Sequence, residues 1–345
     1  MAEENTWTIK STLDWCEGYL ERKGDQNPRL SAQWLMSEAT GLSRIQLYAN
    51  FDRPLTMEER DVMRGYVTRR GKGEPLQYIT GEVGFRYITV KVRPGVLIPR
   101  PETEVLVSEA LALLPAAERR VARDSLLNEY DGAALLEALA EAGAGEPAEG
   151  GESPAPEDAP ASEATEPEPL VVADICTGSG CIACSMASER PDLRVIATDI
   201  SPEAVALAQD NVDALGLADR VTVAQGDLGD AVVGVAPELI GKLDVVVSNP
   251  PYVPTAVMEQ IPAEVADYEP ALALDGGADG LDLFRRLLVF CGQALRPGGG
   301  FAFELHETCL DDAADLARSA GFANVRVVYD LTNRPRVLTG LRPLQ

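Results

Sequence analysis

The chain has 345 residues, of which 46% are hydrophobic and 25% charged, close to the average of soluble globular proteins. This apolar fraction excludes a chain that is disordered throughout. No stretch approaches the roughly 20 uninterrupted apolar residues of a membrane span, and residues 1–10 lack the pattern of a secretory signal, so a cytoplasmic location is expected. Six cysteines are too few for a disulfide scaffold, and a single histidine, His306, argues against a histidine-based metal site or catalytic triad.

The net charge of −25 is spread unevenly along the chain. Residues 1–72 carry 11 basic and 11 acidic side chains, whereas residues 118–169 carry 3 basic and 14 acidic ones, a net charge of −11. An acidic protein repels phosphate, so tight binding of nucleic acid is disfavoured. The neutral N-terminal part is the less repulsive surface.

Residues 1–72 have apolar side chains at roughly helical spacing, and Pro28, Gly41 and Pro54 divide them into three to five short helices. We expect the tryptophans to form the small core of this helical bundle. The alternative is that part of their surface binds a partner. All the tryptophans of the chain lie in this segment: Trp7, Trp15 and Trp34.

Residues 76–98 alternate in polarity and are rich in β-branched and aromatic side chains, with Gly81 and Gly84 as breaks, which predicts a β-hairpin. The run from Pro99 to Glu104 then opens an apolar-periodic helix at about residues 102–114. Proline and acidic residues are typical of a first helical turn.

Residues 118–169 are predicted to be an acidic insertion or linker. Their second part, residues 141–169, contains 9 acidic side chains and no aromatic, leucine, isoleucine or valine. Nothing in it can offset the entropy lost on ordering, so it is predicted to be disordered. Residues 116–140 could form a helix that leads into it.

From residue 170 onward, apolar strand patterns alternate with helical ones, which predicts an α/β fold with a doubly wound, mostly parallel sheet. Two final strands close in sequence predict a hairpin that adds an antiparallel edge strand. The predicted strands cover residues 170–175, 193–198, 221–225, 243–248, 301–305, 324–330 and 336–341, and the predicted helices cover residues 180–190 and 202–215.

A glycine loop from Asp174 to Gly180 follows the first of these strands and opens a helix. Such glycines let the backbone approach a ligand, with helix N–H groups pointing at it. Because Ala183 stands where a dinucleotide fingerprint tolerates alanine, this motif alone does not separate a nucleotide site from a tight turn.

Acidic residues end the next two strands. Asp199 is placed to accept hydrogen bonds from two ribose hydroxyls, and Asp227 could accept one from an adenine amino group. With Asp174 they are expected to line one crevice at the carboxyl edge of the sheet. An acidic rim disfavours a pyrophosphate and favours a cationic sulfonium, which points to S-adenosylmethionine rather than NAD.

The sequence Asn249-Pro250-Pro251-Tyr252 directly follows the fourth strand. Two prolines fix the backbone and remove two N–H donors. The Asn249 side-chain oxygen and the Pro250 carbonyl are then two acceptors, which match the two N–H bonds of a planar NH₂ group. Tyr252 offers a flat face on which a planar amide or base can stack.

With these motifs together, the chain resembles the release factor glutamine methyltransferase family (PrmC/HemK-like) over about residues 6–115 and 170–342. Cys176 departs from the pattern, because many class I methyltransferases have glycine there. The matching pieces are residues 97–104 (Leu-Ile-Pro-Arg-Pro-Glu-Thr-Glu), the glycine loop, Asp199, Ser248 to Tyr252, Tyr268-Glu269-Pro270, Tyr329-Asp330 and Arg336-Val337.

The resemblance implies a class I methyltransferase that uses S-adenosyl-L-methionine to methylate N5 of the glutamine in the Gly-Gly-Gln motif of peptide-chain release factors. It implies a helical substrate-docking domain over residues 1–72, a connector over 73–117 and a catalytic domain over 170–345. No nucleic acid, membrane or metal is expected, and a monomer is favoured. The implied catalytic residues are Asn249, Pro250, Pro251 and Tyr252, and the implied cofactor-binding residues are Asp174, Cys176, Thr177, Gly178, Ser179, Gly180, Asp199, Asp227, Leu228 and Asn249.

Alternatives are open at this stage. DNA adenine methyltransferases share the Asn-Pro-Pro-Tyr motif, so an N6-adenine nucleic-acid methyltransferase is one alternative, although the acidic chain shows no basic recognition domain. A glutamine methyltransferase acting on a ribosomal protein is another. The spacing of Cys176, Cys181 and Cys184 also fits ligands of a plant-type iron–sulfur cluster, with Cys291 or Cys309 as a fourth ligand. The glycine loop and its helix already account for the first three positions.

Overall fold

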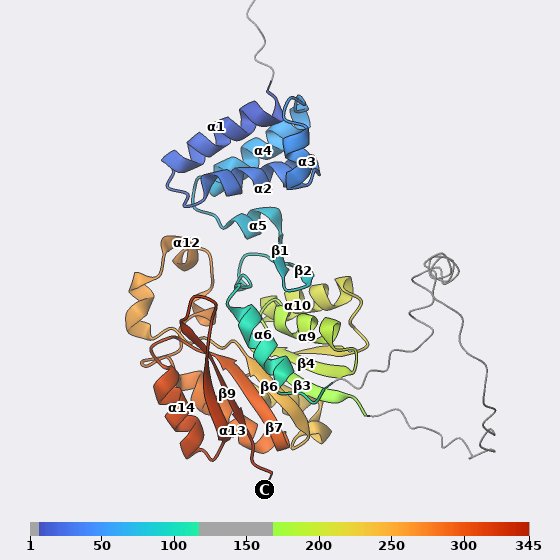
Figure 1. Cartoon of the computed structure of the whole chain (residues 1–345), viewed down its shortest axis with the longest axis vertical. Coiled ribbons are helices and arrows are strands. Elements are labelled where there is room, and N and C mark those ends of the chain that lie inside the picture. The colour runs from blue at the N-terminus through green and yellow to red at the C-terminus, as the bar shows by residue number, and fades with distance from the viewer. Residues whose placement is uncertain (1–6, 117–167, 345) are drawn as a thin grey trace, which may run out of the picture. The chain divides into compact units, whose positions relative to one another are not determined.

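A computed structural model describes residues 7–116 and 168–344 of the chain (Figure 1). The predictions made for the acidic insertion, a helix over residues 116–140 and disorder over residues 141–169, lie outside the described residues. No helix within the described part has the length and apolar character needed to cross a membrane.

The N-terminal segment folds as helices, as predicted. Capping boxes at Thr8, Ser43 and Thr56 start three of them, with each side chain accepting from a backbone N–H one turn later. Gly41 ends another in the left-handed conformation. The helices are α1 (Ile9–Arg22), α2 (Pro28–Thr40), α3 (Arg44–Ala49) and α4 (Met57–Arg70).

The core of this bundle differs from the prediction. Trp15 is 49% exposed and Trp34 is 45% exposed, so the tryptophans do not form it. Trp7, Trp15 and Tyr19 instead pack on one another at the surface. Short helices bury only narrow stripes, which aliphatic side chains fill more closely than indoles do. The buried core includes Ile9, Leu13, Cys16, Leu20, Leu35, Met36, Leu47, Met63 and Val67.

The connector contains the predicted hairpin, β1 (Glu82–Phe85) and β2 (Ile88–Lys91), followed by the predicted helix, α6 (Thr103–Ala112). The start of the predicted strand region is different, since α5 (Leu76–Thr80) is a helix that ends at Gly81 with a φ of 83°. Gly84 lies inside β1 rather than at a break.

The remaining chain forms the predicted doubly wound sheet, in the order β5-β4-β3-β6-β7-β9-β8. The first five strands in this order are parallel, and β9 runs antiparallel to both of its neighbours. The terminal hairpin thus places β8 at the edge of the sheet. The strands are β3 (Leu170–Ile175), β4 (Leu193–Asp199), β5 (Val221–Gln225), β6 (Leu243–Ser248), β7 (Leu295–Glu304), β8 (Ala323–Tyr329) and β9 (Pro335–Leu341).

Helices cover both faces of this sheet, and Figure 1 shows α6 crossing in front of it. Adjacent residues on the strands pack into different cores: Val172 lies with α6 and α9, whereas Ala173 lies with α13 and α14. Burial of both faces explains the nearly continuous apolar strands. The helices of this half are α9 (Cys181–Glu189), α10 (Pro202–Ala214), α11 (Gly229–Val235), α13 (Asp282–Ala294) and α14 (Leu310–Ser319).

A segment of short helices connects β6 to α13. This segment comes directly after the Asn-Pro-Pro-Tyr sequence. An isolated β-bridge pairs Val253 with Asp275 within it. The sequence patterns did not predict these elements. They are η2 (Thr255–Gln260), α12 (Ala263–Ala266) and η3 (Ala271–Ala273), and a further short helix, η1 (Pro237–Leu239), precedes β6.

Candidate functional site

A cavity of about 500 Å³ opens at the carboxyl ends of the parallel strands. Loops after β3, β4, β5 and β6 meet there, which is where ligands bind in open α/β sheets. The sequence-predicted residues that line it are Cys176, Thr177, Gly178, Ser179, Asp199, Asp227, Leu228, Asn249 and Pro251. The remaining predicted site residues, Asp174, Gly180, Pro250 and Tyr252, are not among the residues that line it.

The glycine loop makes a tight turn from β3 into α9. Gly178 and Gly180 have φ angles of 55° and 79°, and a Cβ on Gly180 would lie 3.1 Å from Cβ of Ala208. Glycine is therefore required at this packing contact. Cys176 also adopts the left-handed region, with a φ of 60°, although it carries a side chain. The glycine that many class I methyltransferases have at this position suits that conformation.

Asp174 does not line the cavity, which corrects the prediction that three acids form one rim. It is fully buried beneath the glycine loop, where its Oδ2 accepts from Thr177 Oγ1 at 2.6 Å and from the Ala183 N–H at 3.1 Å. Burial raises the pKa of Asp174 to about 7, against the hydrogen bonds that lower it. The carboxyl therefore holds the loop shape from below.

Asp199 and Asp227 do line the cavity, as predicted. The two oxygens of Asp199 accept from the N–H groups of Gly178 and Ser201, both at 2.9 Å, and burial raises its pKa. Each carboxylate oxygen has a second lone pair that stays available to a ligand. Asp227 pairs with Arg286 at 2.7 Å, so the cavity rim is less acidic than the sequence suggested.

Two residues of the Asn-Pro-Pro-Tyr sequence, Asn249 and Pro251, line the cavity. The Asn249 Nδ2 group donates to Thr103 Oγ1 at 3.2 Å, which leaves its Oδ1 as the free acceptor. Pro250 is buried, and within residues 7–116 and 168–344 no donor bonds its carbonyl oxygen. The Tyr252 hydroxyl donates to Glu304 at 3.0 Å, and its ring lies 6.4 Å from that of His306.

Sequence reasoning missed several residues of this region. Thr103 at the start of α6 and Arg100 just before it line the cavity, and Glu304 accepts a hydrogen bond from Tyr252. The run of residues 97–104 was recognised as a motif, but its spacing says nothing about which side chain faces the cavity. Glu304 could have been noticed as a carboxyl in the otherwise apolar run 301–305.

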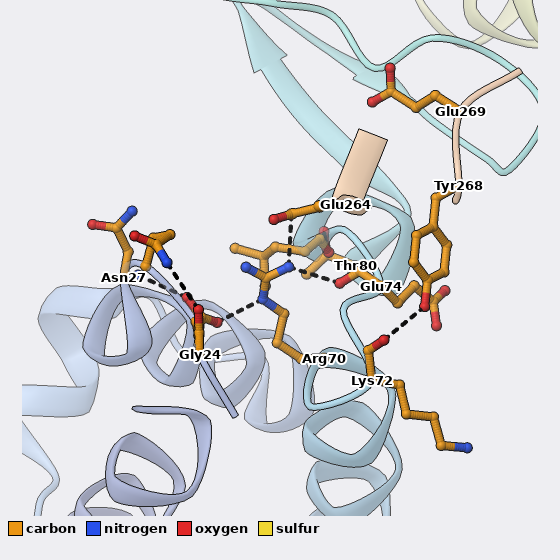
Figure 2. Close-up of polar contacts among 12 residues, drawn as sticks. Gly24, Asn27, Arg70, Lys72, Glu74, Thr80, Glu264, Tyr268 and Glu269 are labelled. Carbon is orange, nitrogen blue, oxygen red and sulfur yellow. Dashed lines mark hydrogen bonds and ion pairs between the residues drawn. The ribbon is translucent and has the colours of Figure 1, made fainter. Parts of the chain in front are cut away.

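The segment after the motif contributes the outer wall, through Pro270, Leu272 and Ala273. Buried Glu269 ties it to the connector by an ion pair with Arg100 at 2.6 Å. Figure 2 shows its other attachments: Arg70 of α4 pairs with Glu264 at 2.8 Å, and the Tyr268 hydroxyl donates to the Lys72 carbonyl at 3.2 Å. Arg70 also pairs with Asp25 at 2.7 Å, so one guanidinium joins the bundle to this wall.

The cysteines pack as small apolar side chains in the described part of the chain. Burial raises the pKa of the Cys184 thiol to about 12, and the thiols of Cys176 and Cys181 are also shifted upward. The structure groups no three histidine, cysteine, aspartate or glutamate side chains of the described residues so that they could hold a metal ion.

Comparison with known proteins matches both halves of the chain. Residues 11–81 match the PrmC N-terminal domain, and residues 163–265 match the methyltransferase small domain. A release factor glutamine methyltransferase of Geobacter sulfurreducens is 38% identical over 97% of this chain and 96% of its own. A relative from Moorella thermoacetica is 37% identical over 97% of this chain and 99% of its own. A relative from Rhodopirellula baltica is 33% identical over 98% of this chain and 97% of its own. The chain belongs to the release factor glutamine methyltransferase family.

Proposed function

We propose that this protein transfers a methyl group from S-adenosyl-L-methionine to the side-chain nitrogen of the glutamine in the Gly-Gly-Gln motif of peptide-chain release factors. The observation that carries the proposal is a pair of free acceptors in consecutive residues: Asn249, which lines the cavity, and Pro250, which follows it in the chain. Asn249 presents Oδ1 because its NH₂ group is occupied by Thr103, and Pro250 presents an unbonded carbonyl. A primary amide has two N–H bonds for these acceptors. We place the reaction in the cytoplasm, where release factors work.

The residues around the cavity fit the proposed cofactor. The volume of about 500 Å³ lies within the range of small-molecule sites. Asp199 would accept from the ribose hydroxyls, Asp227 would face the adenine, and the Cys176–Ser179 turn would pack against the sulfonium end. When bound, the cofactor supplies an electrophilic methyl group, and the protein supplies binding and orientation.

The two acceptors would act by positioning. An amide nitrogen is a poor nucleophile because its lone pair is delocalised. Holding both N–H bonds fixes the nitrogen in one orientation toward the cavity, and alignment of this kind contributes several kcal/mol to catalysis. The same two oxygens stabilise positive charge that develops on the nitrogen. Tyr252 would pack its ring on the amide plane, with its hydroxyl anchored by Glu304.

The helical bundle would recognise the protein that carries the glutamine. A bare amide offers too few atoms for protein specificity, so discrimination requires surface outside the cavity. Trp7, Trp15 and Tyr19 line a second hollow of about 330 Å³ together with Arg60 and Arg64. Exposed tryptophan and arginine are the residue types that most often anchor protein interfaces. Residues 1–72 are neutral where the rest is acidic, which suits a docking surface.

Methylation assays on three substrates side by side test the chemistry. The purified protein is incubated with labelled S-adenosylmethionine and a release factor, a duplex DNA or total ribosomal protein. We expect label only on the release factor, at its Gly-Gly-Gln glutamine, and none on a factor carrying Gly-Gly-Ala. Label on adenine or on a ribosomal protein instead would refute the proposed substrate.

The docking proposal has its own test. Trp15→Ala should raise KM for the intact release factor and leave the affinity for S-adenosylmethionine unchanged. With a short Gly-Gly-Gln peptide, which cannot reach the bundle, the variant and the parent protein should behave alike. An unchanged KM for the intact factor would remove the Trp15 surface from the docking site.

A further inference from the structure

The outer wall of the cavity belongs to a loop that has no core of its own. This wall segment, residues 253–275, is closed at its base, where the Val253 N–H donates to the Leu274 carbonyl at 2.8 Å and the Val253 carbonyl accepts from the Gly276 N–H at 2.9 Å. None of its described apolar side chains is buried. A segment with few buried apolar contacts opens easily. The position of the wall segment therefore depends on the polar contacts that it makes with the rest of the chain.

Two of these contacts reach neighbouring residues at the end of α4. Arg70 Nη1 donates to the Glu264 carboxylate at 2.8 Å, and the Tyr268 hydroxyl donates to the Lys72 carbonyl at 3.2 Å (Figure 2). Tyr268 comes shortly before Pro270, the first residue of the wall segment that lines the cavity. The end of α4 thus holds the part of the segment that leads into the cavity lining.

Arg70 is already fixed on the side of the bundle. Its side chain is 10% exposed, its Nε donates to Asp25 at 2.7 Å, and its Nη1 also donates to the Glu74 carbonyl at 2.9 Å. Glu264, in contrast, is 47% exposed. A fixed and buried guanidinium therefore meets a carboxylate that water can reach, and such a pair forms and separates at little cost in free energy.

The same short stretch of chain contacts the hollow of the bundle. Gly71 lies between the two contacts, and a Cβ on it would lie 2.7 Å from Cε1 of Tyr19. Carbon atoms pack about 3.5–4.0 Å apart, so the backbone of Gly71 lies directly against the Tyr19 ring. Tyr19 lines the hollow and stacks on Trp15, with 5.3 Å between the ring centroids. Residues 70–72 therefore contact the hollow on one side and the wall segment on the other.

We propose that residues 70–72 couple the hollow of the bundle to the cavity, so that a release factor bound at the hollow and S-adenosylmethionine bound in the cavity raise each other's affinity. A partner that fixes the Tyr19 ring also restrains the backbone behind it, and with it the contacts to Glu264 and Tyr268. A wall segment that is already held loses less entropy when the cofactor binds. This coupling is reciprocal. It rests on the proposed function, in which the release factor docks at the hollow.

Two substitutions of nearly equal size break the link on the side of the wall segment. Glu264→Gln removes the charge that pairs with Arg70, and Tyr268→Phe removes the hydroxyl that binds the Lys72 carbonyl. One part-exposed ion pair and one hydrogen bond limit the coupling to about 10-fold. Calorimetry measures the affinity for S-adenosylmethionine with and without a release factor carrying Gly-Gly-Ala, which docks but offers no glutamine. We expect this factor to raise the affinity of the parent protein about 3- to 10-fold, and that of the double variant less than about 2-fold.

Glu259→Gln is the matched control. Glu259 lies in η2 of the same wall segment, is exposed, and makes no ion pair with any residue in the described ranges 7–116 and 168–344. This variant removes the same charge from the same segment without touching the link. It should therefore keep the gain in cofactor affinity that the parent protein shows with the factor.

Hydrogen exchange separates the link from the docking. The backbone amides of Val265 and Glu269 bond within the wall segment, to the carbonyls of Pro262 and Val265. Without any factor, their exchange should be about 3- to 10-fold faster in the double variant than in the parent protein. Adding the factor should slow their exchange in the parent only.

The outcomes are distinct. If the parent methylates release factor but gains no cofactor affinity from it, or if the double variant keeps that gain, the inference is wrong and the proposed function stands. If the parent methylates no release factor, the proposed function fails. The exchange data without the factor then decide alone whether residues 70–72 hold the wall segment, and equal exchange in the parent and the double variant would show that they do not.

Discussion

The parallel sheet and the helical bundle obey different rules of burial. In the sheet half, central strands such as Leu243–Ser248 are buried on both faces, so their apolar runs in the sequence mark core elements. In the bundle, each helix buries only one stripe, and the largest apolar side chains, Trp15 and Trp34, lie at the surface. Periodicity therefore locates elements in both halves, but identifies the core only in the sheet.

The two halves also treat buried carboxyls in opposite ways. Around the cavity, Asp174, Asp199 and Glu304 have raised pKa values because burial outweighs their hydrogen bonds. In the bundle, burial also acts to raise the pKa of Asp25, but hydrogen bonds from Arg70 and Asn27 outweigh it and the pKa is lowered. Asp25 is thus paired with an arginine, whereas among the described residues no arginine forms an ion pair with Asp174, Asp199 or Glu304.

The largest expected effect is a loss of turnover that follows a substitution at the cavity but not a matched substitution in the bundle. Asn249→Ala removes one of the two proposed acceptors and should lower kcat about 10²- to 10³-fold. Cofactor affinity should change little, because Asp199 and the glycine loop are untouched. Asn50→Ala is the control in the bundle, where Asn50 Nδ2 donates to the Gln46 carbonyl of the preceding helix α3. Steady-state kinetics with release factor would check both, and near-parental turnover by Asn249→Ala would contradict the assigned role.

The site was predictable where it depends on short stretches of sequence. The glycine loop, Asp199 and Asn249 each follow a strand directly, so locating the strands placed these residues at one edge. Thr103 lies 146 positions before Asn249, and Glu304 lies 52 positions after Tyr252. Those contacts depend on how α6 and β7 pack, which no local pattern encodes. The prediction that Asp174 lines the cavity was wrong, because the end of a strand places a residue at one edge of the sheet but does not determine whether its side chain is buried.

The second prediction tests the corrected core of the bundle. Leu35 is fully buried, so Leu35→Ala should lower the free energy of unfolding by about 2–5 kcal/mol. Trp15→Ala removes a larger but half-exposed side chain, and we expect a smaller loss, on the order of 1 kcal/mol. Urea unfolding followed by circular dichroism compares them. If Trp15→Ala proved the more damaging, the tryptophans would be the structural core after all.

The third prediction uses pH. Asp174 has a folded pKa of about 7 against an ordinary 3.8, so its contribution to stability is complete below about pH 4 and is lost as pH rises to about 7. Asp25 has a lowered folded pKa, so its contribution is present above pH 3.8 and is lost as pH falls through that lower value.

Asn substitutions at these positions should therefore change opposite limbs of the stability curve. Asp174→Asn should flatten the decline between pH 4 and 7, and Asp25→Asn should flatten the decline in acid. Urea unfolding at a series of pH values measures both. The contrast between the halves would fail if the two variants altered the same limb.

The smallest expected effect concerns two residues in the left-handed backbone conformation. Gly41 of the bundle has a φ of 67°, and Cys176 of the sheet half has a φ of 60° although it carries a side chain. A left-handed residue with a side chain is unfavourable by about 1–2 kcal/mol. Glycine avoids this penalty, but it loses more conformational entropy on folding, which offsets about 0.5–1 kcal/mol of the advantage. Gly41→Ala should lower the free energy of unfolding by about 1 kcal/mol, since a Cβ there meets no atom within 4 Å and the penalty is purely conformational.

Cys176→Gly should act in the opposite direction and raise the free energy of unfolding by about 0.5 kcal/mol. The gain is small because the Cys176 side chain packs partly against the sheet core, and that contact is lost. Cys184→Gly is the control for loss of a buried thiol: it lies inside α9, where glycine is unfavourable, and should destabilise the fold. The midpoints of urea unfolding rank Gly41→Ala, Cys176→Gly and Cys184→Gly by stability. A Cys176→Gly protein less stable than the parent would show that packing, and not backbone strain, decides the residue at this turn.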